Sequence, residues 1–519
     1  MTHAKLHKSL AILLALTLLL GITLTATAEE QDVPTLKVWV PLMWAGKTMD
    51  YNENDAFTKI QENLGIKLEF LTPAIGSEGE QFNIMVTGGT MPDIIFTGWS
   101  GFGGLFTEGA DAYIEGGYIL RLNELVDEYA PNYKHAITEI LPEAERKAVY
   151  SDKGNMYQFA CISPYEEYAW MGLLIREDFL EAVNMDAPET IDEYEEVLRA
   201  FKDELGCTAP LLFPGIESTS GYFMTAYGIA PGWYQKDGEV MYGYTQPEFK
   251  DYLELMKKWY DEGLLYVDFM TYDTEVEQRL VTTGATGMVT NSPATVNAWL
   301  GDKGKMVVAK YPVLESGDQV HYRMLNRQLA ASFGAVITTA CKDVETAVRF
   351  LDYGYSEEGY LLYNYGIEHE TYELIGNKLV FDGFEYPEIS YTDTMMNNPE
   401  YGLMDAILKF KLHAGPYIRF ENQANPTLDP STLAVLKEIT DGADTSWTLP
   451  PFAFTAEEQE VYSEVSTIIN TYQNPAIFEF IMGIRDLSEF DDYVAKINEM
   501  GLDDAKDVIV KAIERYNAR

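Results

Sequence analysis

Apolar and polar residues first alternate at strand spacing near residue 36 and then recur at helical spacing. Leu36, Val38 and Val40 alternate with polar or aromatic neighbours, whereas Phe57, Ile60 and Leu64 share one face of a helix that ends at Gly65. The predicted elements are a strand over 36–40, a helix over 54–64, a strand over 66–71, a helix over 81–86 and a strand over 93–96. This order predicts an α/β unit with a parallel sheet and crossover helices.

The same alternation starts again in the middle of the chain. Strands are predicted over 173–175, 287–290 and 333–338. Thr190 and Glu193 have the spacing of a capping box that opens a helix through Phe201, and Thr245 to Glu248 is expected to open another. The second of these helices places Trp259 on its buried face. These patterns predict a second α/β unit.

Two amphipathic helices are predicted at the C-terminus. The first is opened by Asp486 or Ser488 and stopped by Gly501, and the second starts near Asp503. Their apolar stripes are Phe490, Tyr493, Val494 and Ile497, followed by Ala505, Val508, Ile509, Ala512, Ile513 and Tyr516.

The string from Phe478 to Val494, with Met500-Gly-Leu-Asp503 after it, resembles the C-terminal signature of family 1 extracellular solute-binding proteins. Within that family it looks like the large lipoprotein-like branch that delivers sugars and oligosaccharides to ABC importers. Segments 35–40, 91–96 and 258–265 also resemble this family, so the similarity covers most of residues 33–519. The resemblance implies a two-lobed, periplasmic-binding-protein-like (Venus flytrap) α/β fold with hinge strands and a helical C-terminus.

The resemblance also implies how the chain divides between the lobes. The expected N-terminal lobe is 29–160 plus 313–368, and the expected C-terminal lobe is 161–312 plus 369–519. Crossings between the lobes are expected near 158–166, 308–314 and 366–376. No linker rich in Pro, Gly or Ser separates the lobes, which fits hinge strands.

The N-terminal residues predict export. Lys5 and Lys8 precede an apolar run over 10–22, and Ala26-Thr-Ala28 supplies small residues for cleavage, so residues 1–28 read as a signal peptide. The mature protein is expected to be soluble and extracellular, at the cell surface or periplasmic. Members of the resembled branch commonly carry a lipid-bearing cysteine at this site, which this chain does not have. Release after cleavage and anchoring by an uncleaved signal both stay open.

Composition narrows the class of partner. The chain is 47% hydrophobic, has room for more than one core, and carries a formal net charge of −45. This charge disfavours nucleic acid and anionic membrane as partners. The three cysteines, Cys161, Cys207 and Cys341, lack metal-type spacing and are expected to be small core residues.

Motifs for catalysis or metal binding are missing from the sequence. His135, His321, His369 and His413 are scattered, and the segment 215–221 lacks the G-x-S-x-G spacing of a nucleophile. The helix after Thr190 leads into 205–210 without the Asp/Asn-rich calcium loop that some relatives carry there. We therefore expect no enzyme activity, no cofactor and no metal.

Candidate ligand contacts follow from where open α/β sheets bind ligands, beyond the carboxyl ends of their strands. Sugars stack on aromatic rings and need polar partners for their hydroxyls, so a sugar site combines Trp or Tyr with acids, amides or Arg. Loop residues of these types are Trp44, Trp99, Trp170, Glu217, Tyr222, Trp233, Asn291, Trp299 and Arg327.

The resulting hypothesis is an extracytoplasmic substrate-binding protein, expected to be a monomer, that captures a neutral sugar or oligosaccharide. The ABC importer permease subunits enter as partners only through the resemblance. Two alternatives stay open. A secreted carbohydrate-active hydrolase shares export, acidity and aromatic loops, although pairs among 82 acidic residues arise by chance. A binding protein for a peptide or another solute has the same two-lobed form.

Overall fold

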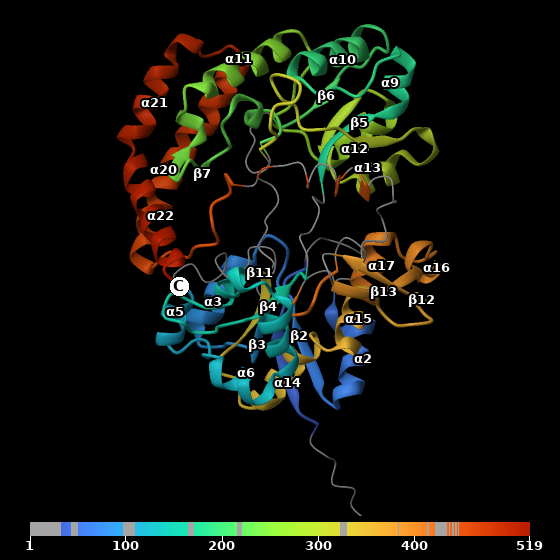
Figure 1. The fold of residues 1–519 in the computed structure, drawn as a ribbon, viewed down its shortest axis with the longest axis vertical. Helices are drawn as coiled ribbons and strands as arrows, with labels where there is room; N and C mark the ends of the chain where they lie inside the picture. The colour runs from blue at the N-terminus through green and yellow to red at the C-terminus, as the bar shows by residue number, and fades with distance from the viewer. Residues whose placement is uncertain are drawn as a thin grey trace, which may run out of the picture.

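The computed structural model describes residues 33–42, 50–96, 109–164, 171–214, 221–321, 330–381, 384–412, 415–420 and 446–519, with single positions between 433 and 444. These residues form two α/β lobes, one above the other in Figure 1. Each lobe has its own sheet and its own buried core. The two-lobed α/β fold predicted from the sequence is therefore confirmed.

The first lobe is built on a five-stranded sheet of order β2-β1-β3-β11-β4. Strands β1, β2 and β3 are parallel, whereas β11 runs antiparallel to both of its neighbours. The strands are β1 (Thr35–Trp39), β2 (Lys67–Leu71), β3 (Ile94–Phe96), β4 (Phe159–Ile162) and β11 (Ala330–Ile337). The helices are α2 (Asp55–Leu64), α3 (Glu78–Gly88), α5 (Ala110–Glu115), α6 (Asn123–Tyr129), α7 (Pro131–His135), α8 (Glu143–Arg146), α14 (Val344–Tyr353) and α15 (Glu357–Tyr365), with a π-helix over Ala136–Ile140 and short 3-10 turns over Tyr51–Glu53 and Lys147–Val149.

Local signals in the sequence set the bounds of the first helix. The side chain of Asn54 accepts a hydrogen bond from the Phe57 amide at the start of α2, and Gly65 ends it with a φ of 65°. Phe57 and Ile60 are buried against the sheet. The predicted strand, helix, strand, helix, strand order over 36–96 is confirmed.

A second group of elements joins the first lobe. The hairpin of β12 (Tyr372–Phe381) and β13 (Phe384–Tyr391) is followed by α16 (Asp393–Met396) and α17 (Leu403–Phe410). Tyr372, Tyr386 and Tyr417 are buried in the core of the first lobe, and the Arg419 amide donates to the carbonyl of Ile162 at 2.9 Å. Residues up to Phe420 therefore pack with the first lobe, because the hairpin buries its inner tyrosines there.

The second lobe is built on a four-stranded sheet of order β10-β5-β9-β6. Strands β6 and β9 are parallel, and β5 is antiparallel to both of its neighbours. Its strands are β5 (Gly172–Arg176), β6 (Leu211–Leu212), β9 (Met288–Asn291) and β10 (Met306–Val308), with a hairpin of β7 (Trp233–Lys236) and β8 (Glu239–Tyr242). Its helices are α9 (Glu177–Val183), α10 (Ile191–Asp203), α11 (Glu248–Asp261), α12 (Thr274–Thr283), α13 (Pro293–Leu300), α20 (Ala456–Ile481), α21 (Phe490–Glu499) and α22 (Leu502–Asn517), with 3-10 turns over Met224–Tyr227, Gly243–Thr245, Gly301–Lys303 and η7 (Leu487–Glu489).

Strands β1, β2 and β3 form the parallel unit predicted from the sequence, whereas β5 and β11 run antiparallel to their neighbours for a physical reason. Strands β5 and β11 each bring the chain into a lobe from the other lobe, so they start at the edge where the parallel strands end. They must then run opposite to β9 and β3. A crossover strand that enters from the facing lobe makes each sheet mixed.

The chain crosses between the lobes at three places. It leaves β4 after Ile162 and enters β5 at Gly172, leaves β10 after Val308 and enters β11 at Ala330, and passes from Phe420 to α20. The third crossing differs from the expected position near 366–376, and residues 369–420 differ from their expected place in the C-terminal lobe. The expected division at 160/161 also falls inside β4.

Helix starts and core positions follow the sequence with one exception. The capping box at Thr190 is present, and Trp259 is fully buried. Thr245 does not cap a helix, because it lies in a 3-10 turn and α11 begins after Pro247 without a side-chain cap. Asp486 caps the turn before α21 through the Ser488 amide, as predicted.

The three cysteines are buried and none of them forms a disulfide bond, as expected for core residues. The predicted apolar stripes of the two C-terminal helices are buried except that Val494 and Ile513 are partly exposed. Figure 1 shows these helices along one side of the second lobe, with the C-terminus beside α5 of the first lobe. Within the described part of the chain, no helix is both long and apolar enough to cross a membrane.

Candidate ligand-binding site between the lobes

The two sheets present their strand ends toward each other. In the second sheet Asn291, the last residue of β9, pairs with Gly172, where the chain arrives from the first lobe. In the first sheet Ile162, the last residue of β4, pairs with Ala330, where the chain arrives from the second lobe. The carboxyl ends of β1, β3, β4 and β9 therefore face the region between the lobes, which is where an open α/β sheet binds ligands.

A polar pair lies at this edge of the second sheet. The side-chain amide of Asn291 donates to a carboxylate oxygen of Glu277 at 2.6 Å, and its carbonyl accepts from the Ser292 amide at 2.6 Å. Glu277 lies on α12 and is 8% exposed, whereas Asn291 is partly exposed. Burial raises the pKa of the Glu277 carboxyl by more than the hydrogen bond from Asn291 lowers it. Asn291 thus stands at the predicted edge with its side chain held in one orientation.

Tyr222 forms part of the wall behind this edge. Its ring stacks on Tyr311 with centroids 4.9 Å apart and an interplanar angle of 9°, and only 2% of the residue is exposed. Tyr311 belongs to the segment that leaves β10 for the first lobe. The structure therefore places Tyr222 in the core beside the crossing, where little of its surface is open to a ligand.

Two of the candidate tryptophans, Trp233 and Trp299, lie on different elements of the second lobe. Trp233 begins β7 and contacts Tyr242 with ring centroids 4.8 Å apart, partly buried against the core. Trp299 lies near the end of α13, where the neighbouring Asn297 bonds both backbone groups of Met306. Trp299 itself packs, partly buried, against the core of the second lobe, and its role stays a prediction.

The remaining predicted contacts are outside the described residues. They are Trp44, Trp99, Trp170, Glu217 and Arg327. In the sequence, the first three follow the carboxyl ends of β1, β3 and β4, so they stay predictions for the first-lobe side of the site.

Sequence reasoning missed Glu277, although a signal was present. The apolar residues Leu280 and Val281 lie three and four positions after it, so Glu277 shares their buried face of α12. An acidic residue on the apolar face of a helix departs from the amphipathic pattern, which indicates that its carboxylate has a hydrogen-bonding partner. Tyr311, which stacks on Tyr222, was missed as well, and nothing in its local pattern distinguishes it from a core tyrosine.

A second cluster joins two of the segments that connect the lobes. The ring of His321 stacks on Trp447 at 3.8 Å between centroids, and its Nδ1 lies 3.2 Å from a carboxylate oxygen of Asp444. Lys236 of β7 lies over the Trp447 ring at 4.9 Å. Burial lowers the pKa of His321 by more than the attraction of Asp444 raises it. Because His321 and Lys236 both contact the Trp447 ring, we describe this ring as a structural contact between the segments.

A comparison with models of known protein families shows which family the chain belongs to. Residues 46–360 match the model of the family described as bacterial extracellular solute-binding protein, which is more than half of the chain. The chain belongs to this family. An extracellular family agrees with the export signal predicted from residues 1–28.

Individual relatives of this solute-binding protein are distant in sequence. Lipoprotein LipO of Bacillus subtilis is 23% identical over 369 residues, which cover 67% of this chain and 70% of LipO. FusA of Streptococcus pneumoniae, a fructooligosaccharide ABC transporter substrate-binding protein, is 21% identical over 90% of this chain and 88% of FusA. These proteins match along most of both chains.

Solved structures of similar fold include FusA in complex with kestose, with a TM-score of 0.75 and 19% identity over 93% of this chain and 99% of that one. An HMO-binding, ABC-transporter-associated solute-binding protein of Bifidobacterium longum infantis has a TM-score of 0.74 and 16% identity over 93% and 99% of the two chains. At this identity the likeness shows the shared fold.

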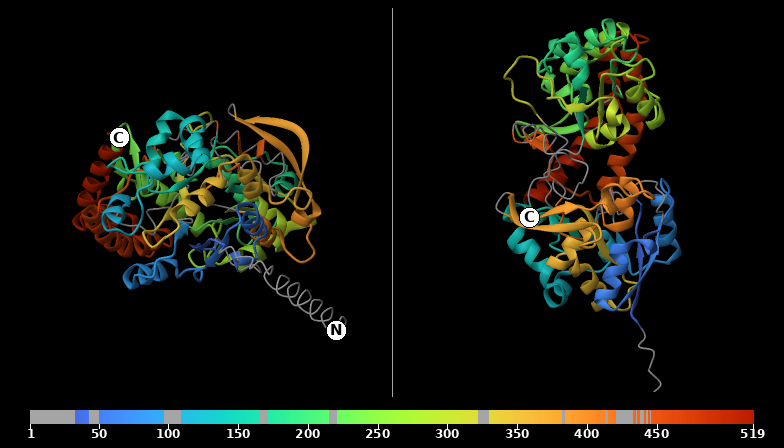
Figure 2. Two further views of the ribbon diagram at one scale, coloured as in Figure 1. Left: turned by 90° about the horizontal axis from the view of Figure 1, so that it is seen from below. Right: turned by 90° about the vertical axis from the view of Figure 1, so that its right-hand side faces the viewer.

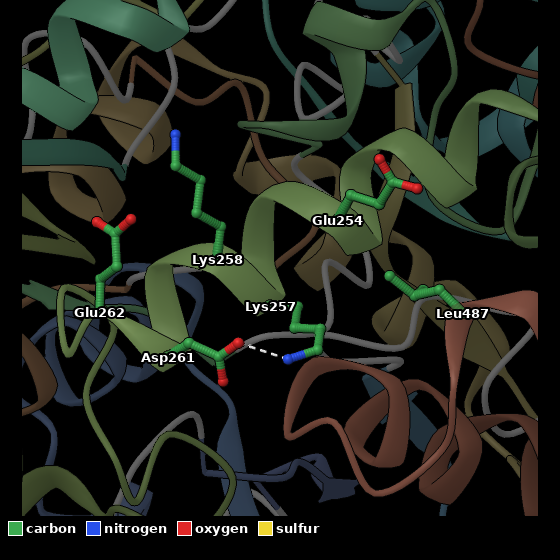
Figure 3. Close-up of a pocket in the computed structure, with 6 residues that line it drawn as sticks. All are labelled: Glu254, Lys257, Lys258, Asp261, Glu262 and Leu487. Atoms are coloured by element: carbon green, nitrogen blue, oxygen red, sulfur yellow. Dashed lines mark hydrogen bonds and ion pairs between the residues drawn. The ribbon is translucent and has the colours of Figure 1, made fainter.

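A shallow pocket of about 370 Å³ lies beside α11 of the second lobe, and Figure 3 shows its lining residues. Its charged groups pair among themselves or with neighbours: Lys257 lies 2.5 Å from Asp261, and Lys258 lies 2.7 Å from Glu195. The helix that carries them, α11, lies on the side of its lobe away from the first lobe (Figure 1). The pocket is lined by Glu254, Lys257, Lys258, Asp261, Glu262 and Leu487.

Within the described ranges, no group of three or more His, Cys, Asp or Glu side chains is arranged to hold a metal ion. The edge between the lobes instead offers the hydrogen-bonding groups of Asn291 at the end of a strand. Such groups can bind a neutral polar ligand by hydrogen bonds.

Proposed function

We propose that this protein captures a sugar or oligosaccharide between its two lobes and delivers it to an ABC importer. The observation that carries the proposal is the pair of sheet edges that face each other, with the oriented amide of Asn291 at one of them. Membership of the extracellular solute-binding family and the named sugars of relatives such as FusA support this reading.

The lobes act on the ligand by enclosing it. Three chain segments join the lobes, so a hinge motion brings the two sheet edges together around a bound sugar. The ligand favours the closed form because only that form lets both edges contact it. A closed, loaded protein is then the form that the permease subunits of the importer recognise.

No covalent step is part of this function. The sugar enters and leaves intact, which separates the proposal from the hydrolase alternative. Recovery of the ligand after binding therefore distinguishes the two activities.

The test is thermal unfolding of the exported protein with a panel of mono- and oligosaccharides that includes kestose. A ligand present at 100 times its dissociation constant stabilises the folded protein by about 2.7 kcal/mol. A raised midpoint with the sugar recovered intact supports the proposal. A cleaved sugar supports the hydrolase, and a panel without any shift moves the assignment to peptides or other solutes.

A further inference from the structure

Glu277 is a buried carboxylate whose surroundings do not neutralise its charge. It is 8% exposed and lies on the apolar face of α12 beside Leu280 and Val281. Its recorded hydrogen bond comes from the neutral amide of Asn291 at 2.6 Å. No Lys or Arg of the described residues forms an ion pair with it, and burial raises its pKa.

Stability does not account for this residue. Burying a carboxylate against apolar side chains destabilises the folded state unless charge partners and several hydrogen bonds compensate. One hydrogen bond from a neutral amide compensates only in part. Groups that lower stability in this way are found where function requires them.

The effect of Glu277 on Asn291 is to set the direction of its amide. The carboxylate accepts one hydrogen of Nδ2, and the Ser292 amide donates to Oδ1, so the two ends of the amide are distinguished and the group does not flip. The second hydrogen of Nδ2 has no partner among the described residues. A hydrogen bond to an ionised acceptor also polarises the amide and strengthens its remaining donor.

The position of Asn291 places this second N–H at the edge of the sheet that faces the first lobe. Asn291 is the last residue of β9, partly exposed, and paired with Gly172 where the chain arrives from the first lobe. Glu277 is set back from it, on the helix behind. The carboxylate therefore holds the residue at the edge without having to reach the ligand itself.

We propose that Glu277 is a positioning residue, which holds Asn291 so that its free N–H donates to a hydroxyl oxygen of the bound sugar. This inference rests on the proposed function, because it assigns a role to a residue of that same site. Asn291 contacts the ligand, and Glu277 acts through it.

Calorimetric titration of the full exported chain tests the proposal with four variants. The wild-type protein is first titrated with neutral oligosaccharides that include kestose, and the tightest binder serves as the probe for Asn291→Ala, Glu277→Leu, Glu277→Gln and the double variant Glu277→Leu/Asn291→Ala. Loss of one oriented hydrogen bond is expected to weaken binding about 10-fold in either Asn291→Ala or Glu277→Leu. The double variant is expected to bind no more weakly than Asn291→Ala, because both changes remove the same contact.

Two readouts separate positioning from a merely structural role. Glu277→Gln keeps a carbonyl that accepts from Asn291 and is expected to bind within about 3-fold of wild type. Glu277→Leu removes a buried charge, so its unfolding midpoint is expected to equal or exceed that of wild type while its affinity falls. A structural residue lowers both together.

Asp352 offers a matched control. It is also a buried acid, 5% exposed, whose carboxylate accepts from an asparagine, Asn132, at 2.7 Å, but it lies among the helices of the first lobe. Asp352→Asn is expected to leave sugar affinity unchanged. If wild type binds a sugar and Glu277→Leu binds it equally well, or loses affinity and midpoint together, the positioning role is overturned and the proposed function stands. If wild type binds none of the sugars, both are overturned.

Discussion

Replacing Asp152 with alanine removes the carboxylate that ties the last helix to the first lobe. Asp152 follows the 3-10 turn before β4, and it accepts from Arg515 Nε at 3.0 Å and from Arg519 Nε at 2.8 Å. Both arginines belong to the end of the chain, which packs with the second lobe through α22. One acid of the first lobe thus holds two cations that come from the other lobe.

The loss in the free energy of unfolding follows from the contacts that the two arginines keep after Asp152 is replaced. Arg515 keeps a bidentate pair with Glu458 at 2.6 Å, whereas Arg519 keeps no carboxylate partner among the described residues and retains the Tyr150 carbonyl at 2.7 Å, the Lys147 carbonyl at 3.5 Å and the Tyr516 ring. The Arg519 side chain is 10% exposed and that of Asp152 is 25% exposed. Exposed pairs contribute about 0–1 kcal/mol and breaking a fully buried pair costs about 3–5 kcal/mol, so we expect a loss of about 2–3 kcal/mol in the free energy of unfolding.

Differential scanning calorimetry measures this loss. Unfolding entropy is about 2 cal/mol/K per residue, so a chain of this length loses roughly 1 °C of midpoint for each kcal/mol, and Asp152→Ala is expected to lower the midpoint by about 2–3 °C. Asp152→Asn retains a hydrogen-bond acceptor without the charge, so its unfolding midpoint is expected to lie between those of wild type and Asp152→Ala.

The control is Asp261→Asn, which removes an exposed ion pair with Lys257 whose side chains are 32% and 53% exposed. It is expected to change the free energy of unfolding by less than about 0.5 kcal/mol. An equal midpoint shift in Asp152→Ala and Asp261→Asn would refute the reasoning, because burial would then add nothing to the pair between the lobes.

Two further predictions concern pH and packing. The pKa of His321 in the folded state lies below its unfolded value of about 6.5. Between these two values the unfolded state binds more protons than the folded state, so the free energy of unfolding falls as pH decreases through that window. The pKa of Asp444 is lowered, so this carboxylate stays ionised there. Melting curves at pH 7.5 and 5.5 should show a smaller drop in midpoint for His321→Gln than for wild type, and an identical drop would contradict the assignment. Gly359→Ala would place Cβ 1.7 Å from the carbonyl oxygen of Tyr353 and is expected to cost about 1–3 kcal/mol in urea unfolding, whereas the control Gly402→Ala has open space and should be nearly neutral.

Helices with local start and stop signals were predictable from the sequence. Asn54 and Gly65 bound α2, and the Thr190–Glu193 capping box opens α10, because each signal acts within a few residues of the backbone it bonds. The burial of Trp259 followed from helical spacing in the same way. Thr245 resembled a cap, but the turn that leaves β8 already uses its hydroxyl, which donates to the Tyr242 carbonyl at 3.0 Å.

The candidate site was predictable only in outline. Asn291 was expected at a strand end, and the structure puts it at the edge that faces the first lobe. Trp299 packs, partly buried, against the core of the second lobe, and its contact with a ligand stays a prediction. Glu277 was missed, since its partner Asn291 is fourteen positions away in the chain and only the fold brings the two side chains together.

The sequence by itself determined the local helices and strands and the core faces, because these depend on periodicity and on bonds between near neighbours, and its resemblance to a known family implied the two-lobed class. Only the tertiary structure decided the antiparallel direction of β5 and β11, the lobe to which residues 369–420 belong, and the pairing of Glu277 with Asn291. These depend on where the chain crosses between the lobes and on contacts between distant residues such as Arg419 and Ile162. Local sequence patterns do not predict such contacts, because the same hairpin or acidic residue is compatible with either lobe and only tertiary packing determines where it lies.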